Sequence, residues 1–158
     1  MELNFEPMCP EDLPEVLEIE RRSFPQPWTP GLFLHELKVP FSRTTLVRAT
    51  NGTRATLAYV CRWLVGDEAH ILNLAVHPDH RGRGLGRRLV ELVVKEAQAA
   101  GARLVTLEVR RENAPARTLY RKLGFVDTGQ RRNYYGRGED AIIMSLALRP
   151  GESPLPGA

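Results

Sequence analysis

The stretch LNLAVHPDHRGRGLGRR, residues 72–88, decides the fold that we expect for this chain. It starts with a mostly apolar run typical of a strand and ends in residues that begin a helical pattern. Between them stand Gly82, Gly84 and Gly86, three glycines in five residues. Glycine allows a tight turn and lets the backbone N–H groups approach a ligand closely. Because unpaired N–H groups and the helix dipole favour an anion at a helix N-terminus, the stretch predicts a pyrophosphate site.

Other glycine-rich phosphate loops fit this stretch poorly. A P-loop requires Gly-Lys followed by Ser or Thr, whereas Gly86 is followed by Arg87 and Arg88. The dinucleotide fingerprint requires a glycine at position 87 and follows the first strand, whereas this loop follows four expected strands. The remaining alternative is a plain strand-to-helix turn, although three glycines between arginines exceed what a turn requires.

The sequence on both sides of the loop reads as a succession of strands and helices. The two prolines of residues 24–28 separate the first two helices, and Thr29 is expected to cap the second. The Pro- and Gly-rich residues 149–158 are expected to form a disordered tail. These patterns predict one domain, residues 1–148, of α/β (α+β) class with a mixed sheet. We expect strands at 3–8, 43–50, 54–65, 69–76, 104–109, 125–132 and 141–148, and helices at 10–22, 29–38, 85–100 and 113–123.

A second informative stretch is LEVRRENAPARTLYRKLGF, residues 107–125. Strand alternation places Glu108 on the face opposite Leu107 and Val109, near the end of its strand. That glutamate is either exposed at an edge or functional, and spacing alone leaves both open. Asn113 is a typical helix N-cap residue. Tyr120 lies in line with the apolar positions of the helix, which fits either core packing or a functional hydroxyl.

The composition limits which class of protein the chain can belong to and which partners it can bind. An apolar share of 42% with 26% charged residues is typical of a soluble globular protein. No apolar run approaches the roughly 18 residues of a membrane span, and no signal peptide is visible. Cys9 and Cys61 are far apart in sequence and form no CxxC pair, as expected of thiols without a functional role in a reducing cytoplasm. The net charge of +3 is modest, but only three of the 22 basic residues are lysines, so arginine is available for an anionic ligand.

The glycine loop resembles the acetyl-CoA signature of the GNAT superfamily of N-acetyltransferases. The resemblance rests on the pattern Arg81-x-x-Gly84-x-Gly86 after Leu74-Ala75-Val76. It implies a GNAT fold, with about seven mostly antiparallel strands and about four helices. Two of the strands are splayed, and the pantetheine lies against the strand that carries Leu74 to Val76. It also implies acetyl-CoA as co-substrate, no metal, and the Val76 N–H as donor to the thioester oxygen. The cofactor-binding residues it implies are Leu74, Ala75, Val76, Gly82, Arg83, Gly84, Leu85, Gly86, Arg87 and Asn113.

Further segments are similar to the ribosomal-protein-alanine N-acetyltransferases (the RimI type) within this superfamily. They are LEVRxxNxxAxxLYxxLGF at 107–125, FPxPWT at 24–29, RRNYY at 131–135 and EDAIIM at 139–144. This resemblance implies that Glu108 is the general base and that Tyr120 protonates the departing thiolate. It implies a protein N-terminus as acceptor, most simply the alanine of a small-subunit ribosomal protein, bound by Phe24, Trp28 and Tyr134. It further implies a cytoplasmic enzyme without nucleic-acid or membrane partners.

The expected reaction is direct attack of an amine on the thioester, without an acyl-enzyme. A protein α-amino group titrates near 8 and a lysine near 10.4, so a weakly basic carboxylate suits an N-terminus better. The alternative acceptors are a lysine or a small-molecule amine. A nucleic-acid-binding module is a third interpretation, supported by the arginines alone.

Two histidine patterns leave alternatives open. His70 resembles a strand histidine of archaeal and eukaryotic N-terminal acetyltransferases, and histidine can accept protons near neutral pH. It can equally be a solvated residue or the partner of a carboxylate such as Glu68. His77 and His80 mimic a metal pair, but no further ligand follows at useful spacing, so loop surface is the expectation.

Overall fold

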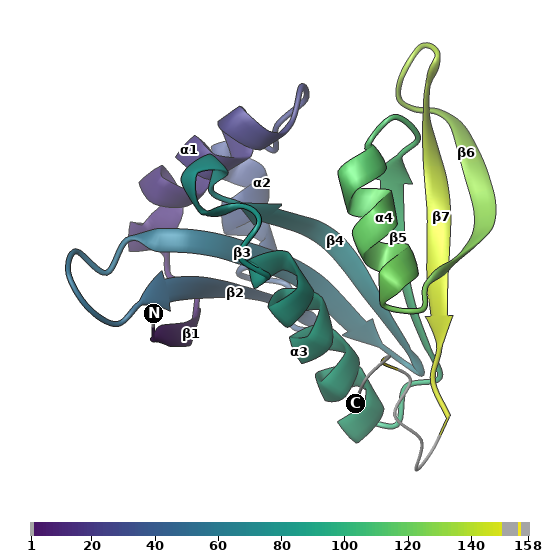
Figure 1. Cartoon of the computed structure of the whole chain (residues 1–158), viewed down its shortest axis with the longest axis horizontal. Coiled ribbons are helices and arrows are strands. Elements are labelled where there is room, and N and C mark those ends of the chain that lie inside the picture. The colour runs from purple at the N-terminus through teal and green to yellow at the C-terminus, as the bar shows by residue number, and fades with distance from the viewer. Residues whose placement is uncertain (1, 150–154, 156–158) are drawn as a thin grey trace. The chain divides into compact units, whose positions relative to one another are not determined.

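Within residues 2–149 and 155, which the computed structural model describes, the chain forms seven strands, four α-helices and two 3-10 helices (Figure 1). Every helix and strand expected from the sequence is present. The strands are β1 Leu3–Pro7, β2 Ser42–Ala49, β3 Thr56–Val65, β4 Glu68–Val76, β5 Leu104–Arg110, β6 Val126–Gly136 and β7 Glu139–Ala147. The helices are η1 Pro10–Asp12, α1 Leu13–Ser23, α2 Pro30–Glu36, η2 Pro78–His80, α3 Leu85–Ala99 and α4 Ala114–Lys122.

The sheet is mixed and mostly antiparallel, as expected. Its strand order is β1-β2-β3-β4-β5-β7-β6. The pairs β1/β2, β2/β3, β5/β7 and β6/β7 run antiparallel, and β4/β5 runs parallel. The parallel register pairs His70 with Thr106 and Ile71 with Leu107. This register places His70 beside the part of β5 that carries Glu108.

The chain divides into two compact units, each built from two separate stretches. Unit 1 consists of Met1–Trp63 and Asn73–Leu89, and unit 2 of Leu64–Leu72 and Val90–Ala158. The boundaries fall inside β3, β4 and α3, so these three elements contribute residues to both units.

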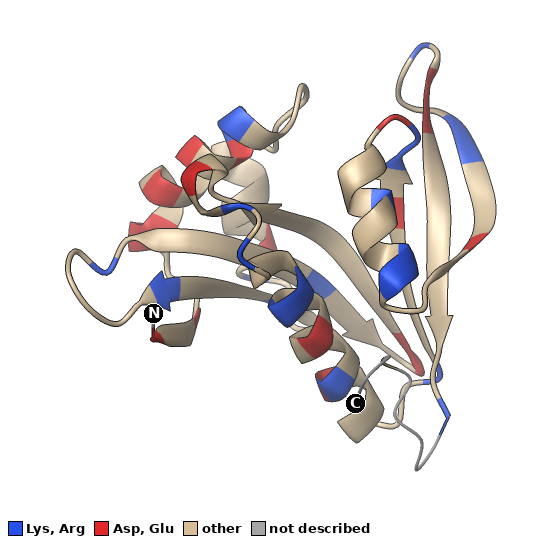
Figure 2. Ribbon diagram, in the orientation of Figure 1, with Lys and Arg blue, Asp and Glu red and all other residues tan. Residues whose placement is uncertain are grey.

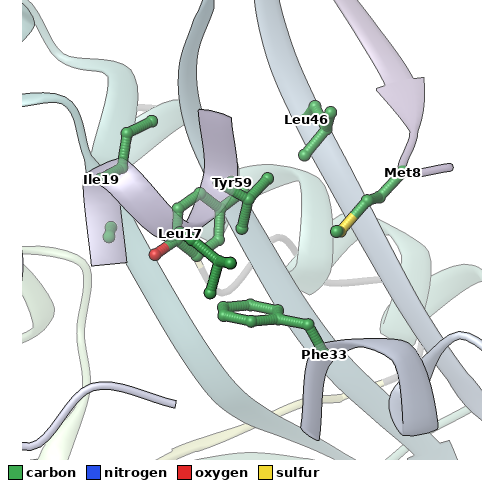
Figure 3. Packing of buried hydrophobic residues seen from close by; sticks show 8 residues of the cluster. Met8, Leu17, Ile19, Phe33, Leu46 and Tyr59 are labelled. Atoms are coloured by element: carbon green, nitrogen blue, oxygen red, sulfur yellow. The ribbon is translucent and has the colours of Figure 1, made fainter. Parts of the chain in front are cut away.

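The core of unit 1 forms where α1 and α2 pack on the inner strands. Val16, Leu17 and Ile19 follow a helical stripe and are buried, as the sequence pattern predicts. Figure 3 shows Leu17 with Phe33 and Tyr59 beside one another in this cluster. The Phe33 and Tyr59 rings meet edge to face, with centroids 5.9 Å apart.

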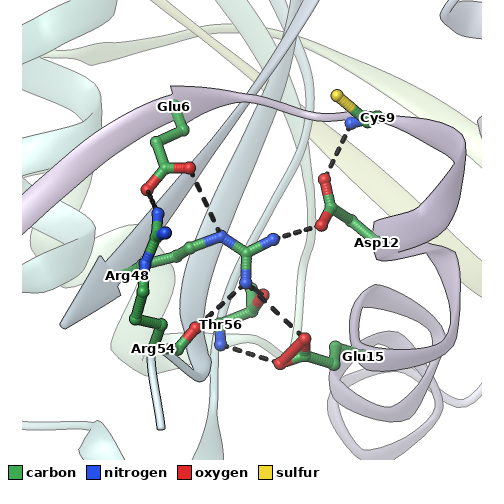
Figure 4. Close-up of polar contacts among 7 residues, drawn as sticks. All are labelled: Glu6, Cys9, Asp12, Glu15, Arg48, Arg54 and Thr56. Carbon is green, nitrogen blue, oxygen red and sulfur yellow. Dashed lines mark hydrogen bonds and ion pairs between the residues drawn. The ribbon is translucent and has the colours of Figure 1, made fainter. Parts of the chain in front are cut away.

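A buried arginine joins the strands of unit 1 to its first helices. Arg48 of β2 is only 8% exposed and pairs with the carboxylates of Asp12, Glu6 and Glu15. Its Nη1 also donates to Thr56 Oγ1 at 3.0 Å (Figure 4). A buried guanidinium is tolerated only when its donors are satisfied. This network therefore ties β1, β2 and the start of α1 together.

Unit 2 packs α4 against strands of the sheet, and a glycine turn ends that helix. Gly124 has φ 99°, the left-handed conformation typical of a helix C-cap. The Phe125 N–H donates to the backbone carbonyl oxygen of Tyr120 at 3.0 Å, which closes the turn. Phe125 is thereby directed into the core with Leu107, Leu123 and Met144, all at most 2% exposed.

The structure corrects the expected end of β6. Residues 133–136 were expected in a connection, but β6 continues to Gly136. Its register with β7 is irregular between Arg131 and Gly136, and Asn133 adopts φ 56°. This stretch is a bulged strand, whose extra residues the sequence pattern does not reveal. Of the expected tail, Arg149 and the buried Leu155 are described, and residues 150–154 and 156–158 lie outside the described residues.

Candidate active site

The glycine loop of unit 1 has the backbone geometry that an anion site requires. Gly82 and Gly84 adopt φ 79° and 80°, where other residues are strained. No atom lies within 4 Å of the position that a Cβ would take at either glycine, so the loop is open there. The first helical bond recorded is from the Arg88 N–H to the Gly84 oxygen, at 3.1 Å. The N–H groups of Leu85 and Gly86 belong to the first turn of α3, where N–H groups have no acceptor within the helix and can face an anion.

Arg81 anchors the loop instead of facing a ligand. Its Nε donates to the Val76 oxygen at 3.0 Å, and its Nη2 donates to Ser23 Oγ at 3.1 Å. On the other side, the His77 N–H donates to the Leu57 oxygen at 2.7 Å. These bonds fix the end of β4, where Leu74, Ala75 and Val76 lie, to α1 and β3. The arginine of the signature therefore holds the loop in shape.

Each of the two loop histidines contacts a neighbouring residue of the same loop. His77 Nδ1 accepts the Asp79 N–H at 3.1 Å, and His80 Nδ1 lies 3.3 Å from Arg83 Nη1. Among residues 2–149 and 155, no three His, Cys, Asp or Glu side chains gather as a metal site.

The functional carboxylate of unit 2 is Glu108, on β5. Its Oε2 lies 2.6 Å from His70 Nε2, and its Oε1 lies 3.5 Å from Arg131 Nη1. The hydrogen bond from His70, followed by the charges of His70 and Arg131, lowers the pKa of Glu108, although partial burial opposes the shift. Glu108 is thus ionised, and an ionised carboxylate only accepts hydrogen bonds, so His70 Nε2 must carry the hydrogen. The contact gives His70 a carboxylate partner, Glu108 of β5, and its part in proton transfer stays a prediction.

Two tyrosines of unit 2 have raised pKa values, and one of them, Tyr135, interacts with the charge of Glu108. Burial raises the pKa of Tyr120 to about 12, and the neighbouring Tyr135 adds to the shift. Burial raises the pKa of Tyr135 to about 12 as well, and Tyr134 and the Glu108 charge contribute. Tyr120 is 7% exposed, and its hydroxyl has no hydrogen-bond partner among the described residues.

One arginine lies over each ring of the tyrosine pair Tyr134 and Tyr135 on β6. The Arg110 guanidinium lies 4.3 Å from the Tyr135 ring centroid, and that of Arg131 lies 4.4 Å from the Tyr134 centroid. A cation over an aromatic ring is attracted to the face of that ring. Tyr134 is 47% exposed, whereas Tyr135 is partly buried, because successive strand residues face opposite sides. The sequence offers Tyr135 of the RRNYY segment, like Tyr134, as an aromatic wall for the acceptor, but the irregular register of β6 hides from the sequence that Tyr135 is the more buried of the two.

The remaining predicted residues fall into two groups. Asn113 caps α4, since its Oδ1 accepts the Ala116 N–H at 3.2 Å, which occupies its oxygen with a structural bond. Phe24 and Trp28 lie between α1 and α2 as expected, partly buried against the unit 1 core. The Trp28 ring lies 5.1 Å from that of Phe33. The structure thus gives Phe24 and Trp28 a packing role, and of the three predicted acceptor-binding aromatics only Tyr134 is largely exposed.

A long part of the chain, which includes the glycine loop and the strand before it, matches a known family. The sequence profile of the Acetyltransferase (GNAT) family matches residues 13–125. The chain belongs to the GNAT acetyltransferase family. It is an acetyl-CoA-dependent N-acetyltransferase, and the GNAT fold expected from the sequence is confirmed.

Relatives of this GNAT chain are similar over most of their length. The [ribosomal protein bS18]-alanine N-acetyltransferase of Escherichia coli (strain K12) is 40% identical over 141 residues, 87% of this chain and 92% of its own. A Bacillus subtilis (strain 168) relative, for which the same activity is predicted, is 43% identical over 140 residues, 87% of this chain and 91% of its own.

Solved structures extend the likeness to nearly the whole GNAT chain. The crystal structure of the Escherichia coli ribosomal-protein-S18-alanine N-acetyltransferase aligns with a TM-score of 0.82, over 98% of this chain and 99% of that one. Identity falls to 34% in this alignment, which takes in more of the chain. Ard1 of Thermoplasma volcanium aligns with a TM-score of 0.85 at 25% identity, over 94% of this chain and 99% of its own. No helix of the described residues is long and apolar enough to cross a membrane.

Proposed function

We propose that this enzyme acetylates the N-terminal α-amino group of a protein, namely the N-terminal alanine of a small-subunit ribosomal protein. The observation that supports it most directly is the ionised Glu108, held by His70 and Arg131 beside two protonated tyrosines. The names of the Escherichia coli relatives, which specify the alanine of bS18, support the same acceptor. Such an acceptor places the enzyme in the cytoplasm, where ribosomal proteins are made, and requires no contact with nucleic acid.

Glu108 accepts the proton that the attacking amine must lose, directly or through one water. A carboxylate with a lowered pKa is a weak base, so the acceptor must itself be easy to deprotonate. An α-amino group titrates at about 7.7–8.0 and a lysine at about 10.4, a difference of more than two pH units in the cost of deprotonation. The lowered pKa of Glu108 therefore favours a protein N-terminus over a lysine.

Acetyl-CoA supplies the acetyl group as a thioester, which an amine attacks directly. The amine nitrogen forms a bond to the acetyl carbon, and the carbon–sulfur bond breaks. The Tyr120 hydroxyl donates its proton to the departing sulfur. With a pKa of about 12, Tyr120 holds that proton throughout the neutral range, as an acid with this role must.

We assign the other predicted residues to binding. The loop N–H groups from Gly82 to Arg87 hold the pyrophosphate, Val76 and its neighbours line the thioester, and Tyr134 contacts the acceptor. Phe24 and Trp28 shape the acceptor site through their packing. We further propose that residues 1–148 act as one acetyltransferase domain, because the family match starts in unit 1 and ends in unit 2.

Acetyl transfer to a peptide panel tests this function. The panel contains a peptide with a free N-terminal alanine and a lysine, the same peptide with a blocked N-terminus, and spermidine as a small amine. We expect transfer to the free N-terminus only. Strong transfer to the blocked peptide or to spermidine would contradict the acceptor and leave the acetyltransferase family untouched. A reaction without enzyme serves as the control for enzyme-dependent signal.

A further inference from the structure

One carboxylate of unit 2 holds the hairpin that β6 and β7 form. Asp140, near the start of β7, accepts the Asn133 backbone N–H on Oδ1 at 2.9 Å. Its Oδ2 accepts from Gln130 Nε2 at 3.0 Å and pairs with Arg111 Nη2 at 3.7 Å. Its carbonyl oxygen accepts the Arg111 backbone N–H at 3.1 Å. Figure 2 shows acidic colour at the start of β7 and basic colour on β6. Asp140 thus connects β6, β7 and the residues that follow β5.

The N–H that Asp140 accepts belongs to the bulge of β6. The register with β7 is irregular between Arg131 and Gly136, and Asn133 lies inside this stretch with φ 56°. A residue with a side chain keeps this left-handed conformation only when its surroundings fix it. Asn133 is fixed from two sides, because its Oδ1 also accepts the Gly138 N–H at 2.7 Å. The bulge therefore depends on Asp140 on one side and on the hairpin turn on the other.

The bulge sets the direction of the residue that follows it. An extra residue in a strand reverses the alternation of the side chains from that point on. Tyr134 follows Asn133 directly, and its side chain is exposed. Arg131 precedes the bulge, in register with Ala141, and its Nη1 lies 3.5 Å from Glu108 Oε1. A change in the bulge should therefore move Tyr134 and leave the contact between Arg131 and Glu108 in place.

We propose that Asp140 is a positioning residue of the acceptor site, which holds the Tyr134 ring in place for the incoming peptide by fixing the Asn133 bulge. The inference rests on the proposed function, which assigns Tyr134 to the acceptor. Asp140 acts through the backbone of Asn133 and takes no part in the proton transfer. Its removal should therefore weaken the binding of the acceptor and leave the step that Glu108 carries out unchanged.

Steady-state kinetics with the alanine-starting peptide, at saturating acetyl-CoA, test this role. Asp140→Ala removes the acceptor of the Asn133 N–H and should raise the KM for the peptide about tenfold, with kcat within about twofold. Asp140→Asn keeps an oxygen for that N–H and loses the charge, so its KM should stay close to that of the unaltered protein. Asn133→Val perturbs the bulge with Asp140 intact, because a branched side chain disfavours φ 56°. It should raise the KM in the same way as Asp140→Ala.

Asp127→Ala is the matched control, and thermal melts check that each variant is folded. It makes the same substitution on β6 ahead of the Asn133 bulge, where Asp127 pairs with Arg117 and Arg121, and should not change the KM. With the unaltered protein active on the peptide, an unchanged KM in folded Asp140→Ala or Asn133→Val would overturn this inference alone. So would an Asp140→Asn variant whose KM rises as far as that of Asp140→Ala, since the charge would then be responsible. If the unaltered protein does not acetylate the peptide, the proposed function fails and this inference with it.

Discussion

At the scale of single residues, the surroundings of Glu108 were partly predictable. Alternation along residues 104–109 places Glu108 opposite the buried Val105, Leu107 and Val109, and the structure confirms this. Its bond to His70 was not predictable, because the register of a parallel strand pair depends on contacts far apart in sequence. With His70 opposite Thr106, Glu108 is the next residue on the same face. One parallel register therefore creates the pair.

Replacing the carboxylate tests its role directly. Glu108→Gln keeps the shape of the side chain but loses the ability to accept a proton. We expect turnover to fall by about 10²–10⁴-fold, with acetyl-CoA affinity unchanged by calorimetry. Glu112→Gln, at an exposed glutamate four residues on, should retain full turnover. Equal turnover in the two variants would remove Glu108 from the proton transfer.

The lowered pKa of Glu108 has a consequence for the pH profile. A lowered pKa means that Glu108 stays deprotonated, and so able to act as a base, at and below its ordinary titration range. The rise of kcat/KM with pH should then follow the acceptor amine, at about 7.7–8.0 for an α-amino group. A peptide starting with 3-fluoroalanine, whose amine is more acidic, should shift this rise to lower pH. A rise that stays at one pH for both peptides would indicate an enzyme group instead.

Tyr120 and Tyr59 offer a contrast between a reactive hydroxyl and a structural one. Tyr120→Phe removes a hydroxyl without a partner among the described residues, so the melting temperature should change little while turnover falls by about 10²-fold. Tyr59→Phe removes a donor 2.5 Å from Glu20 Oε1 and should lower the melting temperature. Thermal melts and steady-state kinetics of both variants check this. A Tyr120→Phe variant with full turnover would exclude Tyr120 as the acid.

At the scale of elements, the glycine loop was the most predictable part of the chain. Glycine spacing alone predicts the turn and the start of α3, and both are present in the structure. The end of β6 was the least predictable, since the bulge at Asn133 interrupts the alternation that defines a strand in sequence. Elements defined by local geometry can be read from sequence, whereas irregular strands depend on the partner strand.

A pair of glycine replacements separates backbone strain from ligand binding. Gly84 and Gly101 share φ 80° and open surroundings, so an alanine at either costs about 1–2 kcal/mol through the same strain. Gly84 stands in the loop, and Gly101 ends α3. Gly84→Ala should weaken acetyl-CoA binding about tenfold or more, which is the loss of about 1.4 kcal/mol, and Gly101→Ala should leave it unchanged. Similar affinities in the two variants would contradict the pyrophosphate assignment.

At the scale of the whole molecule, the division into two units was not visible in the sequence, which predicts one domain. The contacts that define unit 1 join residues far apart in the chain. Glu20 of α1 is 1% exposed and accepts from Tyr59 Oη at 2.5 Å, Asn73 Nδ2 at 2.8 Å and the Trp28 N–H at 2.9 Å. The helical stripe gives no sign that Glu20 is buried, because its donors come from three other segments.

Glu20 should accordingly matter for the stability of the whole protein. Glu20→Gln replaces one acceptor oxygen with a donor that meets other donors, and should cost about 1–3 kcal/mol. At about 2–4 °C per kcal/mol for a chain of this size, the melting temperature should fall clearly. Glu18→Gln, on the same helix in an exposed pair with Arg22, should change it little. Identical melts for the two variants would mean that the Glu20 network does not stabilise the fold.

The interleaving of the two units also bears on how the chain is synthesised and how it can be cut. A nascent chain that has emerged only to Trp63 contains Glu20 and Tyr59 but lacks Asn73, so one donor to the buried carboxylate is still missing. Unit 1 is completed only after the first residues of α3 have left the ribosome. For the same reason, neither unit is a continuous fragment that could be expressed alone. All three unit boundaries fall inside β3, β4 and α3, so a break there would divide a strand or a helix. To produce the protein as two fragments, the chain should be divided at the exposed turn around Gly52.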